Sequence, residues 1–255
     1  MMPAPNATQR FSDRVDNYVR YRPGYPHEIL GLLRDRCGLT PQARIVDIGC
    51  GTGIFTRMLL EHGNPVFGVE PNRQMREAGE GFLAEFSGFR SIDATAEQTT
   101  LPDQSVDFVA AAQAAHWFDR DGARREFSRI LKPGGWVVLI WNERLTEGTP
   151  FLVEYEKLLL QYGTDYAQVR HERTTDTIAE FFAPAPHEMA AFRTQQSFDF
   201  EGLEGRVFSS SYIPSPNDPG SGPLRGALRD LFERRQVNGQ VAFDYDTKVF
   251  FGRLS

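Results

Sequence analysis

Basic residues are in short supply in this 255-residue sequence, which holds 28 Lys and Arg against 34 Asp and Glu and carries a formal net charge of −6. Proteins that bind nucleic acid usually show a basic balance, because neutralising phosphates supplies much of their affinity. The sequence therefore disfavours a nucleic-acid substrate, and we expect no nucleic-acid partner.

Cysteine is scarce as well, since Cys37 and Cys50 are the only two. Two cysteines build neither a disulfide framework nor a zinc site, and the five histidines are scattered without an H-E-x-x-H pattern. No hydrophobic run reaches the length of a membrane span, and the first residues lack the pattern of a signal peptide. We therefore expect a cytoplasmic protein with no metal site and no membrane partner.

Short apolar segments alternate with segments of helical spacing between residues 38 and 142. The apolar segments predict strands at residues 45–48, 65–70, 89–93, 105–112 and 136–141. The segments between them predict helices at residues 54–62, 72–86 and 120–130. This alternation is typical of a doubly wound α/β sheet, in which a ligand lies at the carboxyl ends of the strands.

The pattern changes after residue 150, where strands and helices no longer alternate regularly. Helices are predicted at residues 151–162, 174–182 and 224–237, strands at 193–200 and 241–254, and a loop rich in Pro, Gly and Ser at 214–223. No repeat or linker separates two independent domains. We expect a flexible tail at residues 1–10 and a single domain at residues 11–255.

A glycine-rich turn follows the predicted strand at residues 45–48, with glycines at positions 49, 51 and 53. This G-x-G-x-G spacing differs from the G-x-G-x-x-G dinucleotide fingerprint, and no lysine follows Gly53 as a phosphate loop requires. Asp47 precedes the turn, and its carboxylate would repel a phosphate but suits a ligand with an ammonium group. The turn therefore favours S-adenosylmethionine over a nucleotide, while a plain tight turn with a capping Asp47 is the alternative interpretation.

Glu70 ends the second predicted strand, about twenty residues after the first glycine of the turn. A carboxylate at this place accepts hydrogen bonds from both ribose hydroxyls and excludes a 2′-phosphate. The alternative is a solvated charge at the end of a strand. The pairing of Glu70 with the glycine turn favours the ribose role.

Three segments resemble the class I S-adenosylmethionine-dependent methyltransferases, and the resemblance covers residues 10–142 strongly. They are VDIGCGTG at residues 46–53, ATAE at residues 94–97 and RILKPGG at residues 129–135. Within this family the sequence is similar to the type 11 small-molecule subgroup, near its trans-aconitate-methyltransferase-like and ubiquinone-biosynthesis-like members. That similarity lies in YRPGYP at residues 21–26, AQAAHWF at residues 112–118 and, more weakly, SSSYIP at residues 209–214.

The resemblance implies a fold and a reaction. The fold is a Rossmann-like methyltransferase fold, an α/β, doubly wound, mostly parallel seven-stranded sheet with its last strand antiparallel and a helical cap. We expect a core at about residues 38–142 and acceptor-cap insertions at about 143–193 and 201–240. The reaction is methyl transfer from S-adenosyl-L-methionine to an O-, N- or C-nucleophile of a small-molecule acceptor, such as a carboxylate or a phenol. S-adenosyl-L-homocysteine is then the product, and the protein is a monomer or a homodimer.

The predicted donor site combines the glycine turn with residues that follow the next strands. Arg22 is the candidate partner of the methionine carboxylate, because a guanidinium binds a carboxylate in a bidentate fork, whereas a surface arginine at a helix start is the alternative. Many relatives carry Asp where this chain has Thr95, so the adenine contact is left open between Glu97 and the backbone. The predicted cofactor-binding residues are Tyr18, Arg22, Asp47, Gly49, Cys50, Gly51, Gly53, Glu70, Pro71, Met75, Thr95, Ala96, Glu97 and Gln113.

The predicted acceptor site lies beside the donor. The sulfonium already activates the methyl group, so the protein must mainly align a nucleophile and exclude water. His116 is the candidate general base because imidazole titrates near neutral pH, although a structural histidine is the alternative. Trp117 is expected to wall the pocket or to attract the sulfonium. The predicted acceptor-site residues are Tyr18, His116, Trp117, Trp141 and Tyr212.

Two other functions stay open from the sequence. A non-catalytic S-adenosylmethionine-binding protein would hold the donor without turning it over. An NAD-dependent oxidoreductase would use the same type of strand–turn–helix unit for a dinucleotide.

Overall fold

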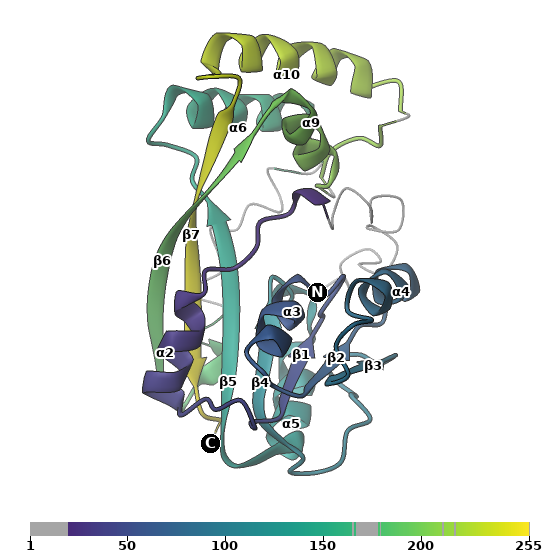
Figure 1. Ribbon diagram of the computed structural model, residues 1–255, viewed down its shortest axis with the longest axis vertical. Helices are drawn as coiled ribbons and strands as arrows, with labels where there is room; N and C mark the ends of the chain where they lie inside the picture. Colours follow the sequence, from purple (N-terminus) through teal and green to yellow (C-terminus); the bar gives the residue numbers. More distant parts are fainter. Residues whose placement is uncertain are drawn as a thin grey trace.

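A seven-stranded sheet runs through the protein in the order β3-β2-β1-β4-β5-β7-β6 (Figure 1). The computed structural model describes residues 20–164, 166, 178, 180–210, 212–216 and 218–254. The strands are β1 (Ile45–Ile48), β2 (Val66–Val69), β3 (Phe89–Ile92), β4 (Val106–Ala112), β5 (Leu131–Arg144), β6 (His187–Phe198) and β7 (Val241–Gly252). Neighbouring strands from β3 to β5 are parallel, whereas β7 is antiparallel to both β5 and β6. The predicted mostly parallel sheet with an antiparallel last strand is confirmed.

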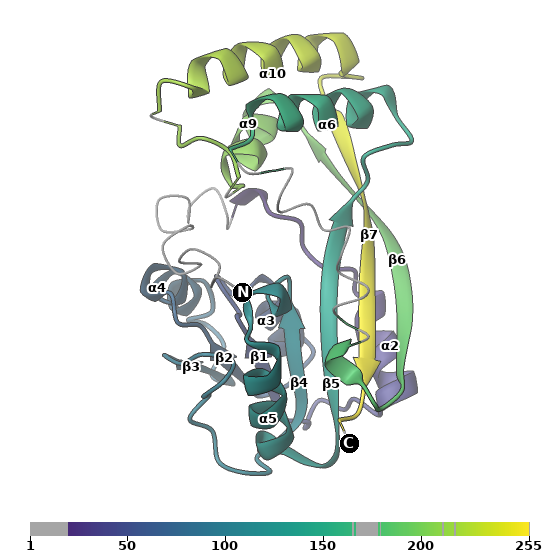
Figure 2. The same ribbon diagram turned by 180° about the vertical axis from the view of Figure 1, so that it is seen from behind.

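Helices cover both faces of the parallel part of the sheet. They are α2 (Glu28–Cys37), α3 (Ile54–Glu61), α4 (Arg73–Phe82), the short 3₁₀ helix η2 (Ala115–Trp117) and α5 (Arg120–Ile130). Successive residues of β4 alternate between two cores: Phe108 packs with α2 and α3, and Val109 packs with α5. Figure 1 shows the molecule from the side of α2 and α3, and Figure 2 shows it from the side of α5. This burial on both faces explains why the strands are nearly continuous apolar runs.

The strand order reverses at β1, because β2 lies on one side of it and β4 on the other. The loops that leave the carboxyl ends of β1 and β4 therefore diverge and open a crevice between them. In doubly wound sheets this reversal point is where ligands bind.

The strands β5, β6 and β7 are much longer than the others and carry a second group of helices at one end (Figures 1 and 2). These helices are α6 (Pro150–Tyr162), α9 (Phe200–Phe208) and α10 (Ser221–Arg235). They enclose a third core together with Phe243 and Tyr245 of β7 and Phe198 of β6. We call this end of the molecule the helical end.

Several boundaries differ from the sequence predictions. The strand β6 begins at His187, six residues before the predicted start at residue 193, because it pairs with β7 in an unbroken ladder from His187 to Phe198. The helices α2 and α9 were not predicted, and α10 begins inside the predicted loop at residues 214–223. Most of the predicted helix at residues 174–182 lies outside the described residues.

Candidate functional site

The glycine turn joins β1 to α3, and its three glycines have positive φ values of 66°, 56° and 86° at Gly49, Gly51 and Gly53. Only glycine adopts this left-handed backbone without strain. A Cβ on Gly49 would lie 2.6 Å from the Cβ of Ala114, so the β1 turn and the segment after β4 approach each other closely. Position 49 therefore requires glycine, because the side chain of Ala114 occupies the space that a Cβ would need.

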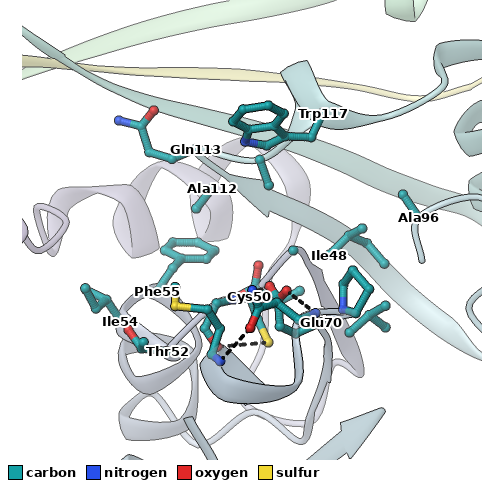
Figure 3. Close-up of a pocket in the computed structure, with 18 of the residues that line it drawn as sticks. Ile48, Cys50, Thr52, Ile54, Phe55, Glu70, Ala96, Ala112, Gln113 and Trp117 are labelled. Carbon is teal, nitrogen blue, oxygen red and sulfur yellow. Dashed lines mark hydrogen bonds between the residues drawn. The ribbon is translucent and has the colours of Figure 1, made fainter. Parts of the chain in front are cut away.

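A cavity of about 250 Å³ lies in the crevice, at the carboxyl ends of β1, β2, β4 and β5 (Figure 3). All the predicted donor-site residues line it except Tyr18 and Gly53. Tyr18 lies outside the described residues. Gly53 is the residue before α3, and a Cβ there would meet Leu83 at 2.6 Å, so its position serves the packing of α3 against Leu83.

Asp47 is a buried carboxylate at the carboxyl end of β1, with 1% of its surface exposed. Thr56 donates a hydrogen bond of 2.6 Å to Oδ2, and Oδ1 has no hydrogen-bond partner among the described residues. Burial raises the pKa of Asp47 to about 7, the bond from Thr56 lowers it and the charge of Glu70 adds to the rise. A ligand with an ammonium group would satisfy Oδ1 and hold Asp47 ionised.

Glu70 directly follows β2 and lies across the turn from Asp47. Its Oε2 accepts from the backbone N–H of Gly51 at 2.9 Å, and its Oε1 accepts from the N–H of Asn72 at 2.8 Å. Burial raises the pKa of Glu70, and these two backbone bonds act in the opposite direction. Each carboxylate oxygen can accept a further bond, so Glu70 offers two oriented acceptors to a pair of ligand hydroxyls.

The third wall of the cavity comes from the segment after β3. Thr95, Ala96 and Glu97 all line the cavity. The carboxylate of Glu97 accepts from the N–H of Asp119 at 2.9 Å, and Asp119 caps α5 through a bond from the N–H of Gly122. This segment is thereby tied to the start of α5.

Gln113 and Asn142 form the wall above β4 and β5. Gln113 has a positive φ of 59°, and its side-chain amide donates to the carbonyl of Asn142 at 2.9 Å. Asn142 in turn donates to the carbonyl of Gly24 and accepts from Thr247 Oγ1 at 2.6 Å. A non-glycine residue held in this conformation by its neighbours is typical of a functional site.

Arg22 lines the same cavity, and its guanidinium donates to the carbonyl of Ser209 at 2.9 Å. It is the only cation among the lining residues that the structure describes. Because Ser209 follows α9, Arg22 connects this cavity to the helical end.

The predicted acceptor-site residues are only partly brought together. Trp117 lines the cavity, and the exposed His116 ring lies 4.7 Å from the Trp117 ring, outside the lining set. Trp141 is buried and packs edge-on against Phe250. Tyr212 lies at the helical end, with its ring 4.8 Å from that of Tyr166.

Several lining residues were missed by the sequence analysis. Asn142 follows a predicted strand, which is the signal that could have identified it, and Asn72 and Phe118 flank predicted residues. Tyr25 lies in the YRPGYP segment of residues 21–26, whereas Phe55 carries no such signal. Both reach the cavity through the packing of α3 against the segment before α2.

Comparison with known proteins agrees with this geometry. The family model described as a methyltransferase domain matches residues 46–139, which span β1 to β5. Residues 46–139 of this chain are therefore similar to the methyltransferase domain family. An uncharacterized methyltransferase of Mycobacterium tuberculosis is 38% identical over 134 residues, 52% of each chain. An uncharacterized methyltransferase-like protein of Schizosaccharomyces pombe is 31% identical over 156 residues, 61% of this chain and 59% of that protein.

The chain spans about half the length of the curated relatives it matches. Solved structures extend the likeness to the whole fold. A proposed type II methyltransferase of Anaeromyxobacter dehalogenans has a TM-score of 0.70 at 20% identity, covering 91% of this chain and 98% of the other. The [4+2]-cyclase SpnF has a TM-score of 0.57 at 17% identity, covering 99% and 98%. At these identities the likeness concerns the fold alone.

Two features are absent from the part of the chain that the structure describes. No helix there is both long and apolar enough to span a membrane. No group of three His, Cys, Asp or Glu side chains is placed to hold a metal ion within that same part of the chain.

Proposed function

We propose that this protein is a methyltransferase that binds S-adenosylmethionine in the cavity above the glycine turn and transfers its methyl group to a small-molecule acceptor. The observation that carries the proposal is the pair of buried carboxylates, Asp47 and Glu70, at the ends of adjacent strands around one cavity. A pyrophosphate would meet repulsion from Asp47 at this place, which argues against a nicotinamide dinucleotide.

The lining residues match the parts of the donor one by one. Asp47 receives the ammonium, Arg22 receives the carboxylate and Glu70 receives the ribose hydroxyls. Thr95 to Glu97 lie where the adenine is expected, with Pro71, Met75 and Cys50 on the walls between. Bound S-adenosylmethionine supplies an electrophilic methyl group, so the remaining task of the chain is to position the nucleophile and exclude water.

The acceptor side is proposed to lie between the donor cavity and the helical end. Gln113, Trp117 and Asn142 line the cavity on that side, and Arg22 bonds to the segment after α9. The helices α6, α9 and α10 then act as the acceptor cap, and Tyr212 belongs to it. His116 keeps its predicted role as a base, and an His116→Asn variant that retains donor binding but loses turnover would support it.

A binding protein without methyl transfer is the second candidate function. The fold of SpnF, a [4+2]-cyclase, shows that a chain with this architecture can serve a reaction other than methylation. The two candidates share the donor cavity and differ only in turnover.

The experiment is a titration of S-adenosylmethionine and NAD against the full chain, followed by a mass screen for methylated products. We expect saturable binding of S-adenosylmethionine, weakened at least tenfold in Asp47→Asn and retained in an exposed control, Asp103→Asn. Stronger binding of NAD than of S-adenosylmethionine would refute the proposal. Donor binding with no methylated product across a panel of phenols, carboxylic acids and amines would favour the second candidate.

A further inference from the structure

A buried arginine without an acidic partner lies at the helical end. Arg206, on α9, has 5% of its surface exposed. Its guanidinium donates to Tyr245 Oη at 3.3 Å and to Ser210 Oγ at 3.1 Å, both neutral acceptors. No carboxylate forms an ion pair with it among the described residues. A buried cation is costly to desolvate unless an anion compensates it.

The surroundings of Arg206 are also positive. Arg144 lies close by and is paired with Glu156, which additionally accepts from Tyr166 Oη at 2.7 Å. Burial by itself raises the pKa of Tyr212, yet the charges of Arg206, Arg22 and Arg144 bring that pKa below its ordinary value. Three guanidinium groups thus act on the hydroxyl of Tyr212, and Glu156 is paired with Arg144.

Polar side chains on one face of β5 and β7 lie between this cluster and the donor cavity. Asn142 lines the cavity and pairs with Thr247, while Arg144 and Tyr245 are the next cross-strand pair on the same face. Two residues of a strand span about 7 Å. Arg206 bonds to Tyr245, and Arg22 bonds to Ser209.

We propose that the acceptor carries an anionic oxygen group, a carboxylate or a phosphate, and that Arg206 binds this group beside the hydroxyls of Tyr245 and Tyr212. The proposal rests on the proposed function, because it names the chemical class of its acceptor. The bound anion supplies the missing countercharge of Arg206. The nucleophile of the same molecule then lies about 7 Å or more from the bound anion, beside Asn142 and Trp117. Tyr212 keeps part of its surface exposed, whereas Arg206 and Tyr245 are buried.

The test compares the full chain with Arg206→Met while acetate or phosphate replaces chloride at constant ionic strength, with S-adenosylhomocysteine present or absent. We expect acetate or phosphate to raise the thermal midpoint of the wild type by several degrees more than chloride does, and not that of Arg206→Met. The anion that raises the thermal midpoint of the wild type more, acetate or phosphate, is the group that the site prefers. Arg225→Met, which removes an exposed arginine paired with Glu204 on the same helical end, keeps the wild-type response.

A second measurement needs no variant. Benzoate and benzamide have the same shape and differ in charge, so we expect benzoate to bind the wild type at least about tenfold more tightly by calorimetry. Equal behaviour of benzoate and benzamide, or an equal anion response of wild type and Arg206→Met, overturns the proposal. A wild type that does not bind S-adenosylmethionine would instead refute the proposed function. The comparison of anions between the wild type and Arg206→Met in the absence of the donor would still test the role of Arg206.

Discussion

At the scale of single residues, Asp47 shows how far a sequence motif can be interpreted and what it omits. The motif predicted a carboxylate facing the ammonium of a ligand. The structure adds that this carboxylate is buried, that Thr56 satisfies one of its oxygens and that the other has no partner among the described residues. The energetic consequence depends on burial, which no sequence pattern reports.

The pKa of Asp47 makes the stability of the ligand-free protein depend on pH. The folded state holds the proton more tightly than the unfolded state, because the pKa rises from 3.8 to about 7 on folding. This contribution is present below pH 3.8 and is lost as the pH rises through about 7. Its full size is about 4 kcal/mol if the whole shift acts on stability.

Asp47→Asn removes this titration while keeping an oxygen for Thr56. We therefore expect the variant to lack the fall in stability between about pH 4 and pH 7 and to exceed the wild type above pH 7, as measured by urea unfolding at a series of pH values. Parallel pH profiles for the two proteins would show that Asp47 is ionised at no cost in the folded state.

Gly53 was predicted to bind the cofactor, but the structure places it outside the cavity lining and close to Leu83. Its φ of 86° and the approach of Leu83 predict that Gly53→Ala destabilises the fold by about 1–3 kcal/mol. Gly31→Ala is the matched control, since Gly31 lies in α2 with open space around it and the change stabilises a helix by about 0.5–1 kcal/mol. Denaturant unfolding measures both, and equal effects of the two changes would contradict this assignment.

At the scale of elements, the strands and helices of residues 45–130 were predictable because each carries its own periodicity and turn residues. The long strands were not: β5 extends to Arg144 and β6 starts at His187 because each pairs with β7 along most of its length. Pairing between distant segments fixes these lengths. The helix α9 was missed because an alternating stretch continues into its start, at residues 193–200.

The bond from Thr247 to Asn142 joins β7 to β5 at the edge of the donor cavity. Thr247 is fully buried, so Thr247→Val leaves Asn142 Oδ1 without this donor and should cost about 1–3 kcal/mol. Thr247→Ser keeps the hydroxyl and is expected to retain most of the stability. The urea midpoints of the two variants measure this difference. A Thr247→Val variant as stable as Thr247→Ser would show that the bond from Thr247 to Asn142 does not stabilise the fold.

At the scale of the whole molecule, the long strands link the donor cavity to the helical end in one continuous sheet. The bonds from Arg22 to Ser209 and from Asn142 to Gly24 add contacts between the two regions. Ligand binding at the cavity should therefore stabilise the entire molecule rather than one end of it.

S-adenosylhomocysteine at about 100 times its Kd should stabilise the chain by about 2.7 kcal/mol. For a chain of this size that corresponds to a rise in Tm of roughly 5–10 °C. Calorimetry should show a single transition that moves as a whole. A second transition that stays in place when ligand is added would show that the helical end unfolds separately.

The sequence by itself determined the doubly wound sheet and about half of the residues that line the cavity, because strand periodicity, the glycine turn and Glu70 are local features whose geometry follows from neighbouring residues. Only the tertiary structure decided where the charges of the helical end lie. Arg22, Arg144, Arg206 and Tyr245 are far apart in the chain, and the pairing of β5 with β7 and the packing of α9 bring them together. Burial then removes the water that would have screened the charge of Arg206, and the hydrogen-bond acceptors around its guanidinium are neutral.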